Sequence, residues 1–284
     1  MGPPVLSTNK LYFLEVDSHG LRSGDVMTTN GNLPAIDVWQ VEIMRVTVFP
    51  TEVVSTDRSS WWDDFVGIPP ETVIARPKAG QFQARGDFEG RQLGLQIQPG
   101  RIEWVVGPIA KALEEAEESF LPSLGPFPEV LNSLSKVVIP WLSEAPPLQR
   151  FAFGAVLLQP VDSVRGGYTL LQKYLDPNVR LDPDSSSDFF YQINRPRPSK
   201  AAVEGLRLNR LAKWSVQVVR RMTMTIGPAG GATRALGEDA ACRLEIDINT
   251  AADFTAVLPA ERLGTLLQEL TDLGREIAQR GDIQ

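Results

Sequence analysis

The sequence predicts an α+β protein with two similar β-rich halves, each with the element order β-α-β-β-β-α. Three observations lead to this expectation. Runs of β-branched and aromatic residues are typical of strands, short turns with Gly or Pro separate them, and amphipathic segments follow at helical spacing. We expect mostly antiparallel sheets with helices packed on one face.

The length and composition are those of a globular protein. The chain has 284 residues, of which 43% are hydrophobic and 22% are charged. We divide it into a loop-rich N-terminal arm over 1–35, a first α+β half over 36–147 and a second α+β half over 148–284.

The first half opens with a long strand over 37–49, which Pro50 closes. A short helix over 59–66 follows, since a serine there can cap it. Tight turns at 88–91 and 99–100 then predict an antiparallel meander. Its strands are expected over 72–76, 81–88, 92–98 and 101–106, before helices over 109–120 and 129–142.

The second half repeats this order with a strand over 151–158 and a helix over 168–175, followed by strands over 188–194, 213–226 and 243–249. Leucines recur at three- and four-residue spacing over 260–279, which predicts an amphipathic helix. We expect this helix to cover the sheet with Ile246 and Ile248 beneath it, so that Glu245 and Asp247 point outward.

Local similarities between the halves point to an internal duplication. Residues 46–50 correspond to 156–160, 76–78 to 195–200, and 105–108 to 225–228. Chance similarity is the alternative. A true duplication predicts that the two halves share a fold and pack as a pseudo-dimer.

The rare residue types exclude several kinds of site. Cys242 is the only cysteine, so one chain can form neither a disulfide nor a thiolate zinc centre, which favours a reducing cytoplasm. His19 is the only histidine, and its turn-like surroundings favour an exposed loop over a catalytic role. We expect no cofactor. The apolar runs are shorter than a membrane-spanning helix, and the net charge of -7 disfavours a DNA-coating role.

Alternation over 245–249 places Glu245, Asp247 and Asn249 on one strand face. Their oxygens suit Mg²⁺, Ca²⁺ or acid–base chemistry. The simpler interpretation is the solvated face of a half-buried strand, because no ligand from another segment is identifiable.

A basic stretch is the candidate for nucleic-acid or phosphate binding. Its residues are Arg195, Arg197, Lys200, Arg220 and Arg221, with Trp214 as a stacking ring. The alternative is a solvated edge whose charge balances the acidic residues of 114–118.

Two further features have alternative interpretations. The glycine-rich segment 227–231 lacks the Lys-Ser/Thr ending of a phosphate loop and predicts a hairpin connection. Trp61 and Trp62 mark either a partner surface or half-buried aromatic packing.

The long early strand, the motif Phe190-Tyr-Gln-Ile-Asn-Arg195 and the late Leu244-Glu-Ile-Asp-Ile248 resemble a sporadically distributed, functionally uncharacterised family of bacterial proteins of similar length. The family motif reads Arg-Tyr-Ile-Asn-Arg, from which Phe190 and Gln192 depart. The resemblance implies a bacterial origin with a defence or mobile-element link, and no catalytic residues.

No nucleophile–base pair or phosphate loop is recognisable, so we expect a non-enzymatic binding or assembly protein that binds a protein partner or itself in the cytoplasm. One alternative is a nucleic-acid or nucleotide sensor that uses the basic stretch. The other is a carboxylate enzyme centred on Glu245 and Asp247.

Overall fold

The computed structural model describes residues 33–55, 60–108, 121–201, 203–227 and 230–282; over 221–236 it describes the backbone alone. The expected strand in the N-terminal arm, the expected helix over 109–120 and His19 lie outside these residues.

The first half contains η1 (Ile36–Val38), β1 (Gln40–Pro50), α1 (Ser60–Val66), β2 (Thr72–Arg76), η3 (Pro77–Ala79), β3 (Gln81–Phe88), β4 (Arg91–Gln98), β5 (Arg101–Gly107) and α3 (Phe127–Trp141). The meander follows from its two-residue turns. Glu89 and Gly90 both have positive φ, at 52° and 76°, as the tight turn between β3 and β4 requires.

The second half contains β6 (Leu148–Val161), α4 (Val164–Tyr174), β7 (Phe190–Asn194), β8 (Arg197–Pro198), β9 (Arg207–Gly227), β10 (Gly230–Thr250), η4 (Ala260–Arg262) and α5 (Leu263–Arg280). Helix α4 begins four residues before the expected 168, because the Ser163 hydroxyl caps it by accepting a hydrogen bond from the Gly166 N–H at 3.1 Å.

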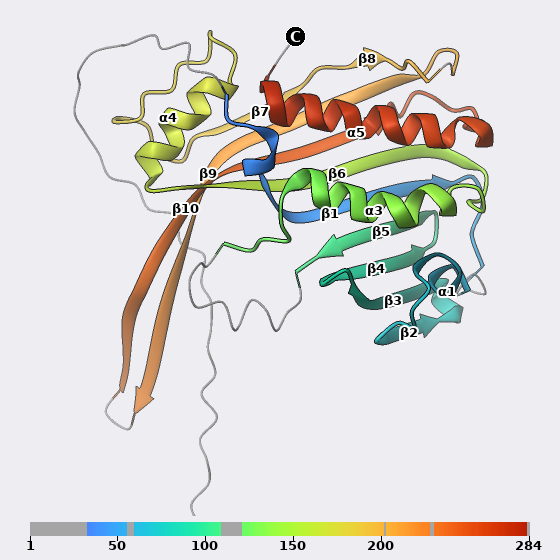
Figure 1. Ribbon diagram of the computed structural model, residues 1–284, viewed down its shortest axis with the longest axis horizontal. Coiled ribbons are helices and arrows are strands. Elements are labelled where there is room, and N and C mark those ends of the chain that lie inside the picture. Colours follow the sequence, from blue (N-terminus) through green and yellow to red (C-terminus); the bar gives the residue numbers. More distant parts are fainter. Residues whose placement is uncertain (1–32, 56–59, 109–120, 202, 228–229, 283–284) are drawn as a thin grey trace, which may run out of the picture.

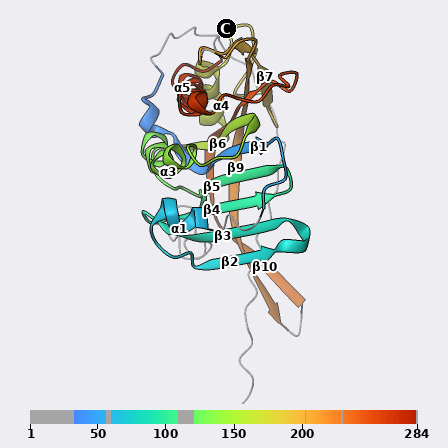
Figure 2. The ribbon, with the colours of Figure 1, turned by 90° about the vertical axis from the view of Figure 1, so that its right-hand side faces the viewer.

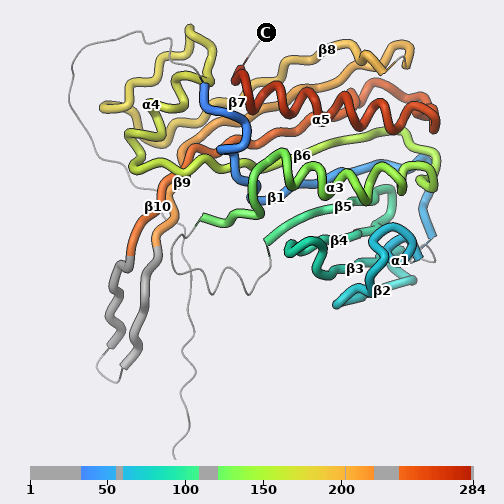
Figure 3. The backbone as a smooth tube through the Cα atoms, in the orientation of Figure 1, coloured from blue at the N-terminus to red at the C-terminus, as the bar shows by residue number. Residues whose placement is uncertain are grey.

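All ten strands belong to one antiparallel sheet in the order β2-β3-β4-β5-β1-β6-β10-β9-β7, with β8 beside β9 (Figure 1). This confirms the α+β class. The two halves share a single sheet. They join where their first strands, β1 and β6, run side by side at the centre (Figure 3). The internal duplication itself stays a prediction.

Strands β9 and β10 are much longer than the sequence suggests, because each is the other's partner along a continuous hairpin. Strand β10 pairs with β6 only between Ala240 and Asn249, so the rest of the hairpin extends past the other strands of the sheet (Figure 1). Gly227 of β9 pairs with Gly230 of β10 at the end of the hairpin, within the segment 227–231 that was expected to connect two strands.

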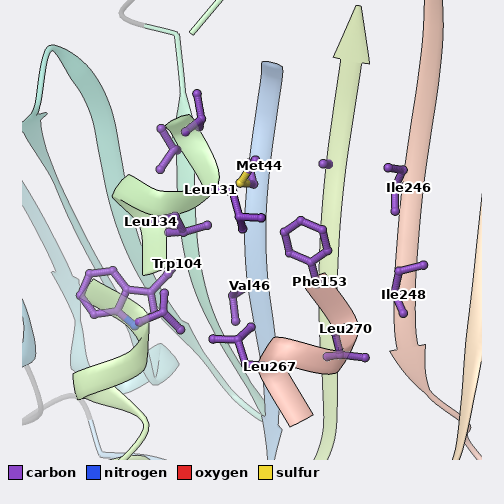
Figure 4. Close-up of a cluster of buried hydrophobic side chains, with 14 of the residues drawn as sticks. Met44, Val46, Trp104, Leu131, Leu134, Phe153, Ile246, Ile248, Leu267 and Leu270 are labelled. Atoms are coloured by element: carbon purple, nitrogen blue, oxygen red, sulfur yellow. The ribbon is translucent and has the colours of Figure 1, made fainter. Parts of the chain in front are cut away.

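Helices α3 and α5 pack on the same face of the sheet (Figure 2). Figure 4 shows Leu267 and Leu270 of α5 facing Phe153, Ile246 and Ile248. All five side chains are buried. The expected cover of the sheet by the C-terminal helix is therefore confirmed, and each buried leucine contributes roughly 1.5–3 kcal/mol.

A cluster of tryptophan rings packs in the core of the first half. Trp61 and Trp62 are 3% and 1% exposed, and Trp61 packs edge-on against Trp141 with ring centroids 5.5 Å apart. Trp62 stacks on Trp104 and donates its Nε1 hydrogen to the Ile68 carbonyl at 2.7 Å. The interpretation of Trp61 and Trp62 as a partner surface is corrected, because burial leaves neither ring accessible.

The opposite face of the sheet carries no helix among the described residues, and we call it the open face. Leu244, Ile246 and Ile248 of β10 are buried on the helix side, while the residues between them are half-buried on the open face. Glu245 and Asp247 thus point away from the helices, as expected.

Candidate functional site

The register of the sheet brings charged side chains together at the centre of the open face. Asp247 of β10 pairs with Gly154 of β6, which in turn pairs with Arg45 of β1. Glu245 lies opposite Lys213 of β9. We define the open-face cluster as Arg45, Lys213, Arg243, Glu245 and Asp247, residues that come from β1, β9 and β10.

Glu245 is held as an anion within this cluster. Its Oε2 lies 3.3 Å from the Lys213 ammonium, and Arg243 binds its other oxygen. Partial burial alone would raise the pKa of Glu245, but the two cations outweigh burial and hold the pKa below its usual range. A carboxylate paired in this way is poorly suited to act as a general acid near neutral pH.

A chain of side-chain amides ends on Asp247. Asn194 donates to Asn209 at 3.1 Å, Asn209 to Asn249 at 3.0 Å, and Asn249 to Asp247 Oδ1 at 2.9 Å. This row crosses β7, β9 and β10 and fixes the orientation of the carboxylate. The second oxygen of Asp247, Oδ2, has no hydrogen-bond partner among the described residues.

Arg45 crosses the neighbouring strand over Gly154. A Cβ atom added to Gly154 would lie 3.2 Å from Arg45 Nε and 3.4 Å from its Cγ, so the glycine provides the space for this side chain. Arg45 is exposed and forms no hydrogen bond or ion pair with any described residue. A hollow of about 110 Å³ lies beside it, lined also by Leu211, Lys213 and Asp247.

The neighbouring acidic group on the open face is already neutralised. Glu103 of β5 accepts a hydrogen bond from the Thr47 hydroxyl at 3.0 Å and forms an ion pair with Arg101. Glu42 of β1 lies 3.5 Å from Arg243 and has a buried Oε2 without a hydrogen bond among the described residues, whereas Arg45 and Asp247 keep unused hydrogen-bonding capacity beside the hollow.

The predicted basic stretch is paired with acidic residues of the same chain. Arg195 binds Asp282, with 2.9 Å between Nη2 and Oδ2, and lies 3.7 Å from Asp176. The hydrogen bond with Asp282 raises the pKa of Arg195. Arg197 lies 3.1 Å from Glu276 of α5.

The remaining members of the stretch lie in two places: Lys200 lines the same hollow beside α5 as Arg197, whereas Arg220 lies in the long hairpin. The Lys200 backbone N–H donates to Glu269 of α5 at 2.7 Å. Arg220 lies 2.7 Å from Glu238 within the long hairpin, and the Arg221 side chain lies outside the described residues. The charges of Arg195, Arg197 and Arg220 are thus balanced by Asp282, Glu276 and Glu238, whereas the proposed partners at 114–118 are not described.

Trp214 does not fit the stacking role predicted for it. Its ring is fully buried on the helix side, stacked on Tyr174 with centroids 5.2 Å apart and edge-on to Trp39. A base cannot reach this ring without unfolding the core. The structure therefore corrects the assignment of Trp214 to a nucleic-acid surface.

Cys242 is likewise a core residue. Its Sγ lies 3.2 Å from the Gly167 carbonyl, and burial raises the pKa of the thiol to about 12. The thiolate form needed for nucleophilic attack is therefore scarce at neutral pH.

No family model, curated protein or solved structure matches this chain. Within the described residues, no helix is long and apolar enough to cross a membrane. In the same residues, no three His, Cys, Asp or Glu side chains gather as a metal site would require, and Glu245 and Asp247 gain no third ligand of these types.

The sequence alone pointed to Glu245 and Asp247, and to Lys213 only as part of the basic stretch, but not to Arg45 or Gly154. The alternation of Arg45 and Thr47 with apolar neighbours in 43–49 marks them as residues of the strand face opposite the apolar one. Their place beside Asp247 depends on the pairing of β1 with β6, which no local pattern specifies.

Proposed function

We propose that this protein is a non-enzymatic binding or assembly protein that receives a protein partner on the open face of its sheet. One observation carries the proposal: the Arg45 guanidinium, which has no partner among the described residues, lies over Gly154 beside the half-satisfied carboxylate of Asp247. A carboxylate of the partner would form a charge-assisted hydrogen bond with the Arg45 guanidinium. A hydrogen-bond donor of the partner would bind Oδ2 of Asp247.

The size of the hollow favours a protein over a small ligand. Pockets for small molecules usually enclose about 300–1,000 Å³, whereas the hollow beside Arg45 measures about 110 Å³. That space fits one side chain of a partner whose other contacts spread over the sheet.

The two alternatives have less support. A nucleic-acid sensor would use cations that are already paired, such as Arg195 with Asp282, on a chain of net charge -7. A carboxylate enzyme would use Glu245, which Lys213 and Arg243 already neutralise.

The test compares the proteins that the purified chain retains from an extract of its source cells. The variants are Arg45→Glu and the control Arg262→Glu, since Arg262 is exposed and its side chain has no partner among the described residues. At least one protein should bind the wild type and the control equally. Its retention should fall about tenfold or more with Arg45→Glu, the loss expected for a charge-assisted hydrogen bond. An identical set of proteins on all three chains would contradict the proposal.

A further inference from the structure

Strand β2 forms one edge of the sheet and leaves its outer side unpaired. It is the last strand in the order and pairs only with β3, from Thr72↔Arg85 to Arg76↔Gln81. All five of its residues are exposed. No other described backbone group bonds to it, so part of its N–H and C=O groups face solvent.

This edge lacks the features that usually prevent edge-to-edge pairing. Natural edge strands carry prolines, bulges or several charges. The register of β2 with β3 is regular, its prolines lie outside the strand at Pro70 and Pro77, and Arg76 is its only charged residue. The strand can therefore accept a further strand.

Two adjacent apolar side chains on β2 are exposed and would be buried by an added strand. Val73 is 53% exposed and Ile74 is 45% exposed, and they point to opposite faces of the sheet. A strand added along β2 would cover both side chains and pair the free backbone groups in one step.

We propose that β2 pairs antiparallel with β2 of a second copy of this chain, about a two-fold axis at Ile74, so that two sheets become one. In this register the two Ile74 side chains face each other, and Val73 of each copy faces Ala75 of the other. Thr72 faces Arg76, which keeps the two Arg76 charges at opposite ends of the ladder.

A second copy is favoured because the strand complements itself. A two-fold axis perpendicular to the sheet keeps both helix-covered faces on one side and closes the assembly at two copies. Pairing of β2 with the other edge, β7, would instead join copies head to tail into a ring or an open filament. The dimer uses a surface separate from the open-face cluster and does not depend on partner binding there.

The first test measures molar mass in solution over a concentration series, using light scattering and sedimentation equilibrium. The wild type should approach twice the 31.3 kDa of one chain at high concentration. Ile74→Lys opposes two ammonium groups at the axis and should remain a monomer. The control Ile139→Lys, at a position 51% exposed on α3, should dimerise like the wild type. A monomeric wild type, or a dimer that Ile74→Lys leaves intact, would overturn the proposal.

The second test locates the axis. Ile74→Cys places two thiols opposite each other, where Cβ atoms of facing residues lie about 4.5–5.5 Å apart, close to disulfide range. A mild oxidant should link this variant into a covalent dimer. Ile139→Cys should stay unlinked, and the native Cys242 is buried. Equal linking of both variants, or growth into long polymers, would contradict a closed β2 pair.

Discussion

Arg45 of β1 and Gly154 of β6 fit together because the glycine has no side chain. A Cβ atom on Gly154 would lie 3.2 Å from Arg45 Nε. The absence of that atom lets the Arg45 side chain lie over Gly154, next to the hollow that Asp247 of β10 also lines. The open-face cluster therefore depends on a glycine in the middle of the sheet.

Gly154→Ala should weaken partner binding while leaving the fold intact. The backbone of Gly154 is not among those with positive φ, so alanine fits the strand, but its Cβ displaces Arg45. Thermal unfolding should show a stability change within about 1 kcal/mol. The control Gly107→Ala, in β5 with nothing within 4 Å of an added Cβ, should change neither binding nor stability. Unchanged binding by Gly154→Ala would show that the position of Arg45 is not critical.

Gly274→Ala should destabilise the protein although alanine normally favours a helix. The added Cβ would lie 2.9 Å from Cε1 of Phe153, a core ring that has little room to move. The control in the same helix is Gly264→Ala, which meets nothing within 4 Å and should gain up to about 1 kcal/mol. Urea unfolding of both variants measures the change in the free energy of unfolding. An increase in both variants would refute close packing of α5 on β6.

Leu267→Asp should cost several kcal/mol, because a charge would be buried without a partner. Leu267 is 3% exposed and faces the sheet in Figure 4. Circular dichroism during urea unfolding measures the loss, and Ile139→Asp, on the exposed side of α3, should change stability little. Wild-type stability in Leu267→Asp would mean that the leucine stripe is an interface between molecules.

Asp282 should make stability depend on pH in the acid range. Partial burial alone would raise the pKa of Asp282, but hydrogen bonds from Arg195 and Tyr191 outweigh burial and hold the pKa below its usual value of 3.8. A depressed carboxyl pKa stabilises the fold above the unfolded value and loses this effect as pH falls through the folded value. Asp282→Asn should therefore be less stable than the wild type at pH 7 and should approach it below pH 3.8. Unfolding at several pH values measures this difference, and a constant difference would exclude the linkage.

Local patterns predicted the elements that depend on neighbours in sequence. The meander of β3, β4 and β5 follows from turns such as Glu89–Gly90, and α5 follows from the leucine spacing. The lengths of β9 and β10 were underestimated, because the Gly- and Ala-rich start of β10 has weak strand propensity and becomes a strand through its partner.

The candidate site could be predicted only in part, since its geometry depends on long-range pairing. Alternation identified the face that carries Glu245 and Asp247. The approach of Arg45 depends on register between β1 and β6, more than 100 residues apart. A long separation in sequence also hid the partner of Arg195, because Asp282 lies 87 residues away.

The most direct measurement is the reactivity of Arg45 toward phenylglyoxal, an arginine-specific reagent, read by mass spectrometry of peptides. The chain is labelled alone and in the complex purified from its source cells. We expect Arg45 to react in the free chain and to be protected in the complex, while the exposed Arg262 reacts equally in both. Equal labelling of Arg45 in the two samples would contradict a partner bound on the open face.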